Sequence, residues 1–416
     1  MARREPGRNA LYFVALTVLL DVIGFSLILP ILPRLLVDLT GKGLSQAAIY
    51  GGWLSFLYAA IQFVCAPILG GLSDRFGRRP VLLYAVGSFA VDYLIMGFAP
   101  TLGWLFLGRV ISGISGASFT PAYACVADLS PPEKRAQNFG LISAVFGVGF
   151  ILGPAIGGLL SHWGVRAPFF AAAILSFVSL LYGSIVLPET LPVERRRPFD
   201  WRRANPLGTL LHMRRQHAVR GVLAALFLWM VGHQVMPTTW SFYTKLRFGW
   251  SEATIGASLA TAGIVMALSQ ALLTRRLIPR IGERRAALLG IAVACIGYFG
   301  YGTATQSWMM FAWLATWFFG ALVMPSTNAL LSHRVPPDAQ GELQGAVACL
   351  FSLASIVGPL LLPQIFSHFT SGRGPYVPGA SFLFAGLLAF TCWFVYRAAT
   401  RESAIAAAPN LQGNAA

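Results

Sequence analysis

Two stretches of the chain match each other at an offset of 205 residues: Ala127-Asp-Leu-Ser-Pro-Pro-Glu-Lys-Arg-Ala-Gln-Asn-Phe-Gly140 and Ser332-His-Arg-Val-Pro-Pro-Asp-Ala-Gln-Gly-Glu-Leu-Gln-Gly345. From each stretch an apolar helix runs to a Gly-Pro pair, Gly153-Pro154 in the first case and Gly358-Pro359 in the second. One offset aligns all of these positions, and a chance match would not keep that register across a loop and a helix of membrane-spanning length. We therefore interpret the chain as two halves derived from one ancestral unit.

The composition indicates an integral membrane protein. Of the 416 residues, 56% are hydrophobic and 11% are charged, whereas soluble domains carry about 25% charged residues. Apolar runs of about 20 residues suffice to cross a bilayer, and such runs recur along the whole chain. The pattern predicts an all-α fold with twelve spans, at roughly 10–33, 46–71, 80–98, 102–128, 137–161, 166–187, 220–244, 252–275, 284–304, 307–331, 342–367 and 377–399.

The net charge of +16 is distributed by topology. With the amino terminus placed in the cytoplasm, 24 of the 31 Lys and Arg residues fall in the termini and loops on that side. Six fall on the other side, and Arg109 lies within a span. This positive-inside pattern predicts that both termini are cytoplasmic. It also argues against nucleic-acid binding, because the basic residues suit anionic lipid headgroups.

The domain boundaries follow from the polar stretches. The longest of these contains Pro188-Glu-Thr-Leu-Pro-Val-Glu-Arg-Arg-Arg-Pro198 and no apolar periodicity, as is typical of a linker. We expect a first six-helix bundle at 1–187, a cytoplasmic linker at 188–219, a second six-helix bundle at 220–401 and a disordered tail at 402–416.

Nothing in the sequence indicates an enzyme, a metal site or a cofactor. The five cysteines all fall in predicted spans without paired or metal-like spacing. There is no nucleophile motif, phosphate-binding loop or paired-carboxylate motif. The first apolar run is long enough to span and has no small-residue cleavage site, so we expect no cleaved signal peptide. An ion gradient, or the substrate's own gradient, is then the expected energy source.

The loop between spans two and three reads Gly70-Gly-Leu-Ser-Asp-Arg-Phe-Gly-Arg-Arg-Pro80. Gly77 suits a tight turn, and charge-assisted hydrogen bonds among its acid and arginines can latch helix ends together. A degraded copy, Arg280-Ile-Gly282-Glu-Arg284, follows at the same offset, which favours a latch over a merely solvated, topology-setting loop. The predicted latch comprises Gly70, Asp74, Arg75, Gly77, Arg78 and Arg79.

Span five carries glycines on one helix face. Glycines four residues apart let a neighbouring backbone approach closely, and a proline inside the helix removes one hydrogen bond and bends it. The alternative to a role in conformational change is generic tight packing. The positions concerned are Gly149, Gly153, Pro154, Gly157 and Gly158.

These motifs resemble those of the major facilitator superfamily. The loop at 70–80 is similar to its signature loop, and the glycine helix is similar to the motif of its drug/proton antiporters. The resemblance implies twelve transmembrane helices in two pseudo-symmetric six-helix halves around a central cavity. In the superfamily an acid at the end of span four joins the signature-loop charges, and we assign that role to Asp128.

Within the superfamily the chain most resembles bacterial tetracycline efflux proteins, from about residue 10 to 368 and more densely in the first half. The matching segments are Leu20-Asp21, Tyr58-Ala, Gln62-Phe, Asp92-Tyr93, Gly108-Arg109 and Gly341 with Leu343-Gln-Gly345. Two positions depart from the family pattern. Those exporters carry an aspartate where this chain has Ala294, and a histidine where it has Met266, four residues before Gln270. Both lost groups are linked to substrate and proton in that family. Their absence argues against metal-chelated tetracycline as the substrate.

Three charged residues stand out well inside predicted spans, away from the span ends: Asp21, Asp92 and Arg109. A charge at the centre of a span costs about 2.5–3.5 kcal/mol on insertion scales, so such residues must face protein or water. The second half has Leu226, Gly297 and Leu314 at the same offset, which suggests a task rather than a scaffold requirement. We interpret them as proton-coupling residues, with Asp21 as the leading acid and Arg109 as the counter-charge, because burial and a nearby arginine shift a carboxyl pKa in opposite directions. The alternative is an Asp–Arg pair that only neutralises itself.

Uncharged polar and soft side chains in the spans are candidates for a substrate cavity, since methionine and aromatic groups suit adaptable pockets. For any single one of them, packing in the core or against lipid is the competing interpretation. The two glutamines are the better supported, because a buried amide needs a partner. The candidates are Gln62, His233, Gln234, Met266, Gln270, Trp313 and Asn328.

Together these features predict a monomeric secondary exporter of the bacterial inner membrane that exchanges protons for a drug-like amphiphile. Sodium coupling is not excluded by the sequence. One alternative is an exporter or facilitator of a physiological metabolite with the same fold. The other is a membrane sensor that has kept the fold but does not transport.

Overall fold

The computed structural model describes residues 6–116, 119–131, 134–198, 217–336, 339–372 and 374–406. These residues are helical wherever they form regular structure, and no strand occurs among them. Twelve segments are long and apolar enough to cross a membrane, as predicted, and the all-α fold class is confirmed. Residues 402–406 of the predicted tail are helical and continue α19, whereas 407–416 and residues 199–216 of the predicted linker lie outside the described residues.

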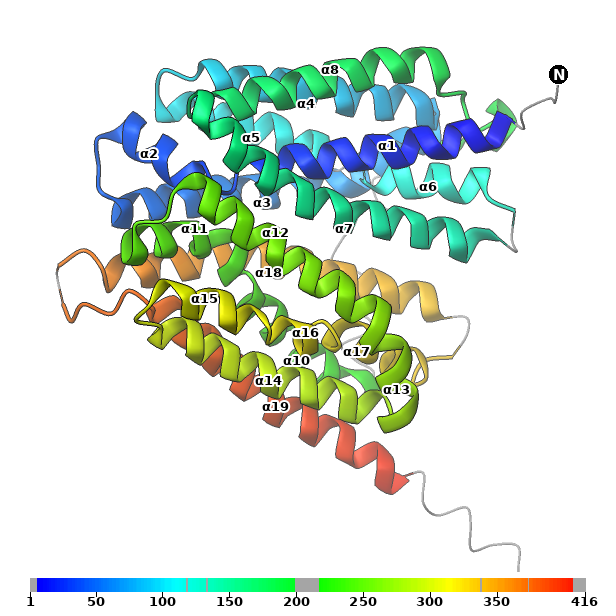
Figure 1. The fold of residues 1–416 in the computed structure, drawn as a ribbon. Helices are drawn as coiled ribbons and strands as arrows, with labels where there is room; N and C mark the ends of the chain where they lie inside the picture. The colour runs from blue at the N-terminus through cyan, green and yellow to red at the C-terminus, as the bar shows by residue number, and fades with distance from the viewer. Residues whose placement is uncertain are drawn as a thin grey trace, which may run out of the picture. The chain divides into compact units, whose positions relative to one another are not determined.

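The first six spans are built from eight helices and one short helical turn (Figure 1). They are α1 (Pro6–Leu27), α2 (Leu32–Thr40), α3 (Leu44–Phe76), α4 (Arg78–Phe98), α5 (Leu102–Gly116), α6 (Phe119–Leu129), α7 (Arg135–Leu160), η2 (Ser161–Trp163) and α8 (Ala167–Val186).

The last six spans are more interrupted. A short turn, η3 (Val193–Arg195), precedes them in the linker. They comprise α10 (His217–His233), α11 (Val235–Phe248), α12 (Glu252–Leu268), the π-helix η4 (Ser269–Thr274), α13 (Arg275–Ile281), α14 (Glu283–Thr303), α15 (Ser307–Leu314), α16 (Trp317–Gly320), α17 (Val323–Ser332), α18 (Gln340–His368) and α19 (Ala380–Ala406).

The first span ends earlier than predicted. We expected it to continue to residue 33, but α1 ends at Leu27 and a turn separates it from α2. Pro30 lies in that turn, and Pro33 occupies the first turn of α2, where its missing N–H costs no hydrogen bond. The two prolines therefore end one helix and begin the next.

The described chain forms two compact units that do not coincide with the sequence halves. Unit 1 comprises Met1–Asn205 and Ser241–Gly263, and unit 2 comprises Pro206–Trp240 and Ile264–Ala416. In unit 1, α1 packs along α7 and α8, and α3 and α4 pack on α5 (Figure 1). In unit 2, α19 lies between α10 and α14, and α17 packs on α14. The core of unit 1 includes Phe13, Val18 and Val126, which pack with apolar residues of α7.

Candidate functional site

A buried carboxyl group lies between α4 and α5 in unit 1. The Asp92 side chain is 0% exposed, and neither of its oxygens has a hydrogen-bond partner among the described residues. The polar groups that act on it are the guanidinium of Arg109 and the hydroxyl of Ser112. The Ser112 hydroxyl donates instead to the Gly108 carbonyl at 3.0 Å. Buried polar groups are normally hydrogen-bonded, so a carboxyl that lacks such a partner among the described residues calls for an explanation.

Arg109, which acts on the Asp92 carboxyl, also contacts soft and aromatic side chains. The side chain is buried, its guanidinium lies 2.7 Å from the Met96 sulfur, and its Cζ lies 6.0 Å from the centre of the Tyr58 ring. A cation over an aromatic face is attracted by the ring quadrupole. The Gln62 amide donates to the Tyr58 hydroxyl at 3.3 Å and to the Gly116 carbonyl at 2.8 Å. The predicted cavity residue Gln62 thus lies in the same polar cluster as the predicted proton-coupling arginine.

The third predicted charge, Asp21, belongs to α1, but its side chain lies outside the described residues. One turn further along, Gly24 faces α4, where a Cβ atom would collide with the Tyr93 hydroxyl. Tyr93 directly follows Asp92 in α4. The structure thus brings the backbone of α1 against the helix that carries the buried acid.

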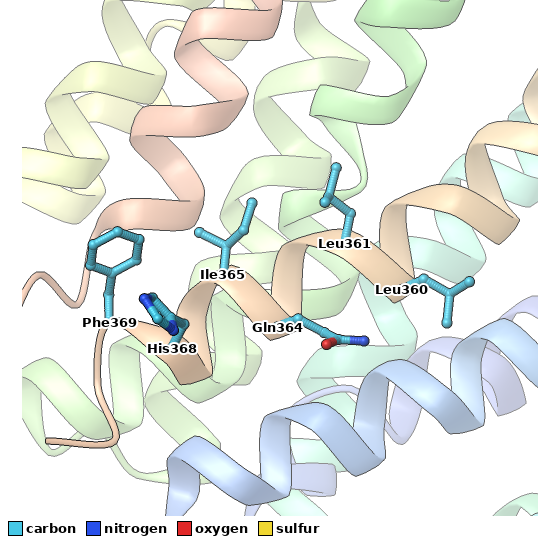
Figure 2. Close-up of a pocket in the computed structure, with 6 residues that line it drawn as sticks. All are labelled: Leu360, Leu361, Gln364, Ile365, His368 and Phe369. Carbon is cyan, nitrogen blue, oxygen red and sulfur yellow. The ribbon is translucent and has the colours of Figure 1, made fainter. Parts of the chain in front are cut away.

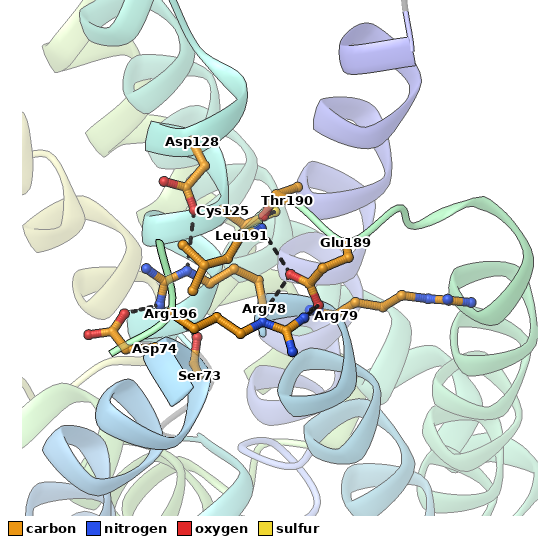
Figure 3. Close-up of polar contacts among 10 residues, drawn as sticks. All are labelled: Ser73, Asp74, Arg78, Arg79, Cys125, Asp128, Glu189, Thr190, Leu191 and Arg196. Carbon is orange, nitrogen blue, oxygen red and sulfur yellow. Dashed lines mark hydrogen bonds and ion pairs between the residues drawn. The ribbon is translucent and has the colours of Figure 1, made fainter. Parts of the chain in front are cut away.

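The predicted latch centres on Arg78 (Figure 3). Its guanidinium forms ion pairs with Asp74 at 2.6 Å and with Asp128 at 3.3 Å, and it donates to the Ser73 hydroxyl at 2.8 Å. These contacts join the end of α3, the start of α4 and the end of α6. The Arg79 side chain does not join these ion pairs; its guanidinium donates to the Ser184 carbonyl of α8 at 2.6 Å.

Two predicted members have other surroundings. Arg75 lies over the ring of its neighbour Phe76, with 5.1 Å between Cζ and the ring centre, and Gly70 lies within α3. Gly77 separates α3 from α4 with a φ of 108°, a backbone conformation that favours glycine.

The sequence analysis missed Glu189, which completes the latch. Its carboxylate accepts hydrogen bonds from the backbone N–H groups of Arg78 at 2.8 Å and Arg79 at 3.3 Å (Figure 3). These N–H groups open α4, so the acid neutralises the positive end of the helix. A Cβ atom at Gly77 would collide with this carboxylate, which is a second reason for glycine there. A helix start with no capping side chain of its own was the signal that could have led to a distant acid.

The linker continues this contact. The Arg196 guanidinium lies 3.9 Å from the Glu189 carboxylate, and the backbone N–H of Arg197 donates to the Asp74 carbonyl at 3.1 Å. The Thr190 hydroxyl reaches the Cys125 sulfur of α6 at 3.6 Å. The described first part of the predicted linker is therefore anchored along the signature loop.

Unit 2 contains a counterpart with reversed charges. At the offset of 205 residues, Arg78 and Asp128 correspond to Glu283 and His333, and these two form a pair of their own at 3.5 Å. The counterpart of Arg79, Arg284, donates to the Thr400 hydroxyl of α19 at 2.9 Å. Arg334 reaches the Ala399 carbonyl at 3.3 Å, and burial lowers the pKa of its guanidinium.

The glycine face of α7 is closely packed within unit 1. A Cβ atom at Gly153 would collide with the Ser26 hydroxyl and lie 2.8 Å from the Ile23 carbonyl of α1. At Gly149 it would lie 2.9 Å from the Val22 side chain. A Cβ atom at Gly158 would lie 2.7 Å from the Glu252 carbonyl of α12. The sequence spacing thus corresponds to close backbone approach on two sides, with Gly157 against Leu27 and Pro154 against Gly256.

The predicted cavity residues of unit 2 have different surroundings. The Gln234 amide donates to the Ser355 hydroxyl at 2.7 Å, and the Trp313 ring packs over Gly300. The Asn328 amide oxygen is buried without a hydrogen-bond partner among the described residues, and Met266 is partly exposed. His233 lies among aromatic side chains and is described below.

Two irregular backbone segments meet around Gln270. Span eight contains the π-helix η4, and span ten is interrupted at 315–316 and 321–322, where amides such as Thr316 donate three residues back. The Ser269 hydroxyl donates to the Phe318 carbonyl at 2.5 Å, and the Gln270 amide lies 3.4 Å from the Ala321 carbonyl. Short π segments occur often at functional sites, and broken helices often carry transporter binding sites. The π-helix contains neither proline nor glycine, but Gly320 directly precedes the second interruption of span ten, and Pro325 has no N–H to donate to the Ala321 carbonyl four residues earlier.

One open surface depression of about 470 Å³ lies along the end of α18 (Figure 2). Figure 2 shows its six lining side chains on consecutive turns of that one helix, with Gln364 and His368 as the polar members. A depression lined by a single helix does not bring polar groups from several elements together, so we assign no role to it.

A family model and several known proteins match most of the chain. The family model described as Major Facilitator Superfamily matches residues 14–304 and 240–413. The chain is 43% identical over 359 residues to the tetracycline resistance protein, class C, of Escherichia coli, covering 86% of this chain and 90% of that protein. It is 40% identical over 371 residues to the class G protein of Vibrio anguillarum, covering 86% and 91%.

Solved structures share the fold. The crystal structure of the human organic anion transporter MFSD10 (TETRAN) superposes with a TM-score of 0.71 at 27% identity, covering 94% of this chain and 100% of that one. A bacterial homologue of the human lysosomal transporter Spinster, in an inward-facing and occupied conformation, gives a TM-score of 0.77 at 16% identity, covering 96% and 98%. With twelve spans, the signature-loop contacts and these matches, the chain belongs to the Major Facilitator Superfamily and is a multi-pass membrane transporter of that fold.

Proposed function

We propose that the protein exports a drug-like amphiphilic compound from the bacterial cytoplasm in exchange for protons. The observation that carries the proposal is Asp92, a fully buried carboxyl without a hydrogen-bond partner among the described residues, in the same cluster as Arg109. Such a group can bind a proton in one conformation and release it in another, when the position of the guanidinium or the access of water changes.

Several other features support this function. The relatives named above are tetracycline resistance proteins. The glycine-rich sequence of α7 resembles the motif of drug/proton antiporters, and this helix packs closely on α1. A proton gradient supplies the energy in this proposal, so no cofactor is required. The protein acts as a monomer in the inner membrane with both termini in the cytoplasm, as the charge bias predicts. Asp21 remains a second candidate for proton coupling.

The test is a susceptibility screen across drug classes in a host that lacks its major efflux pumps, followed by proton flux in everted vesicles. Each drug whose inhibitory concentration rises should release protons from energised vesicles that contain the wild-type protein. Asp92→Asn should abolish both effects at equal expression. Asp38→Asn is the matched control, because Asp38 is 56% exposed and pairs with Arg34 on α2. Full resistance and normal proton flux in Asp92→Asn would overturn the proposal.

A second candidate is export of an organic anion. The structural similarity to MFSD10, whose name describes an organic anion transporter, favours it, as does Arg109, a buried cation that contacts a sulfur and an aromatic ring. Uptake of the anionic dye fluorescein into the same vesicles would separate the candidates. An anion exporter should accumulate the dye and lose this activity in Arg109→Gln, whereas an exporter of uncharged amphiphiles should not accumulate it.

A further inference from the structure

Four ring side chains from three helices of unit 2 surround one another. The His233 ring lies 4.9 Å from the Trp317 ring and 6.1 Å from the Trp229 ring, measured between centres. The His233 Nδ1 atom lies 3.4 Å from the Tyr298 hydroxyl. We call Trp229, His233, Tyr298 and Trp317 the aromatic box. Trp229 and Tyr298 are buried, whereas His233 and Trp317 remain partly accessible, so the box is closed on one side and open on the other.

Beside the box, the contact of Gly320 with its neighbours is ordinary rather than tight. A Cβ atom at Gly320 would make only ordinary contacts, at 3.5 Å to Ala294 and 4.0 Å to the Trp229 ring. At Gly290, on the neighbouring face of α14, it would lie 2.8 Å from the Phe319 carbonyl, which is too close for a real side chain. The contact beside Trp229 is therefore less tight than the contact at Gly290 of the same helix pair.

The wall that carries Trp317 is a short, interrupted segment. The helix α16 has four residues, and hydrogen bonds from Ser269 and Gln270 of the π-helix hold its neighbouring carbonyls. An interrupted helix at the centre of a span can adjust without losing a continuous hydrogen-bond ladder.

The charges of unit 2 decide which kind of ring would be bound. In its described spans, the acids Glu283 and Glu342 lie in the first turns of α14 and α18, far along the chain from the box. A cationic ligand would find no carboxylate there to offset its loss of hydration. Aromatic faces and one imidazole instead offer stacking and a single hydrogen bond.

We propose that the aromatic box binds an uncharged planar ring of the substrate on its accessible side, with the Trp317 ring as the stacking face and His233 as the hydrogen-bonding partner. The proposal deepens the proposed function and rests on it for the direction of transport, but binding itself needs no proton gradient. It assigns substrate selection in unit 2 to aromatic stacking rather than to an acid.

The experiment measures binding of acridone, a neutral fluorescent tricyclic ring, to the purified full-length protein in nanodiscs without a gradient. Wild type should bind it, and Trp317→Leu should weaken binding about tenfold, the loss expected for one stacked aromatic contact. His233→Gln should weaken it about fivefold through the lost hydrogen bond. Trp317→Tyr, which keeps a ring, should restore most of the affinity.

Trp308→Leu is the matched control, because Trp308 lies in the same span and is 68% exposed, and it should bind acridone as wild type does. Proflavine, a planar cation of the same ring size, should bind more weakly than acridone. The proposal is overturned if wild type fails to bind acridone, if Trp317→Leu and His233→Gln bind it normally, or if proflavine binds more tightly through Trp317. Antiport can fail in vesicles while this binding persists, so the two proposals can fail separately.

Discussion

At the scale of single residues, Glu189 shows how a loop acid can hold a helix end. Three backbone N–H groups, from Arg78, Arg79 and Leu191, converge on its carboxylate, and the Arg196 guanidinium lies nearby. The first N–H groups of a helix have no partners within the helix, and a charged acceptor satisfies them more strongly than a neutral one. The link between spans two and three therefore depends on a residue more than a hundred positions away.

We expect Glu189→Gln to lower the stability of the folded protein by about 1–2 kcal/mol, because a neutral amide is a weaker cap than a carboxylate. The measurement is thermal unfolding of purified protein in detergent, followed by transport in vesicles. Glu194→Gln is the control, since Glu194 is exposed in the same linker and should leave the melting temperature unchanged. Equal melting temperatures for Glu189→Gln and wild type would show that the cap contributes nothing measurable.

At the scale of helices, the contact between α7 and α1 is the clearest case of sequence spacing becoming structure. Glycines at 149, 153 and 157 present their backbone to α1, and side chains would collide at each position. Gly147 of the same helix has no atom within 4 Å of its would-be Cβ. The two kinds of position on one helix give a matched pair for mutation.

Gly153→Leu should reduce transport about tenfold or more, because the added side chain costs about 1–3 kcal/mol in packing and separates the helices. Gly147→Leu should transport like wild type. Initial rates of drug-driven proton flux, normalised to protein in the membrane, test both. Normal flux in Gly153→Leu would mean that α7 can leave α1 at no cost to the transport cycle.

The sequence predicted the helices well because apolar length and glycine spacing are local signals. The twelve spans were accessible in this way, whereas the contact of Asp128 with the latch was expected from the resemblance to the major facilitator superfamily. The π-helix at 269–274 was not accessible in either way, since it depends on side chains such as Ser269 bonding carbonyls of another helix. The aromatic box was not assembled from the sequence either, because the rings that surround His233 come from α14 and α16 as well as from its own helix.

At the scale of the whole molecule, the residue at position 294 affects which substrate the protein can bind. This chain has Ala294 where the exporters that it resembles carry an aspartate. A metal–tetracycline complex is cationic, and binding it in a low-dielectric site needs a nearby carboxylate. Ala294 cannot supply one, and the described acids of unit 2, Glu283, Glu342 and Glu402, lie near helix ends.

We therefore expect this protein to raise the inhibitory concentration of tetracycline far less than the class C protein of Escherichia coli does in the same host. Ala294→Asp should increase tetracycline resistance, and Ala294→Asn, of the same size without the charge, should not. The measurement is the inhibitory concentration of tetracycline for hosts that express each variant at the same level. Resistance equal to that from the class C protein in the wild type would show that an acid of unit 1 serves the drug.

The reversed pair in unit 2 has a consequence for how the two halves diverged. If the duplicated unit carried an arginine and an aspartate at positions 78 and 128, changing the arginine first would have set two acids against each other. Changing the aspartate to histidine first avoids this, because an imidazole is uncharged unless it is protonated. The second change, to glutamate, then places a carboxylate beside the imidazole, as in Glu283 and His333, and the two attract each other when the ring is protonated. Histidine thus offers an evolutionary route along which no intermediate had to place like charges side by side.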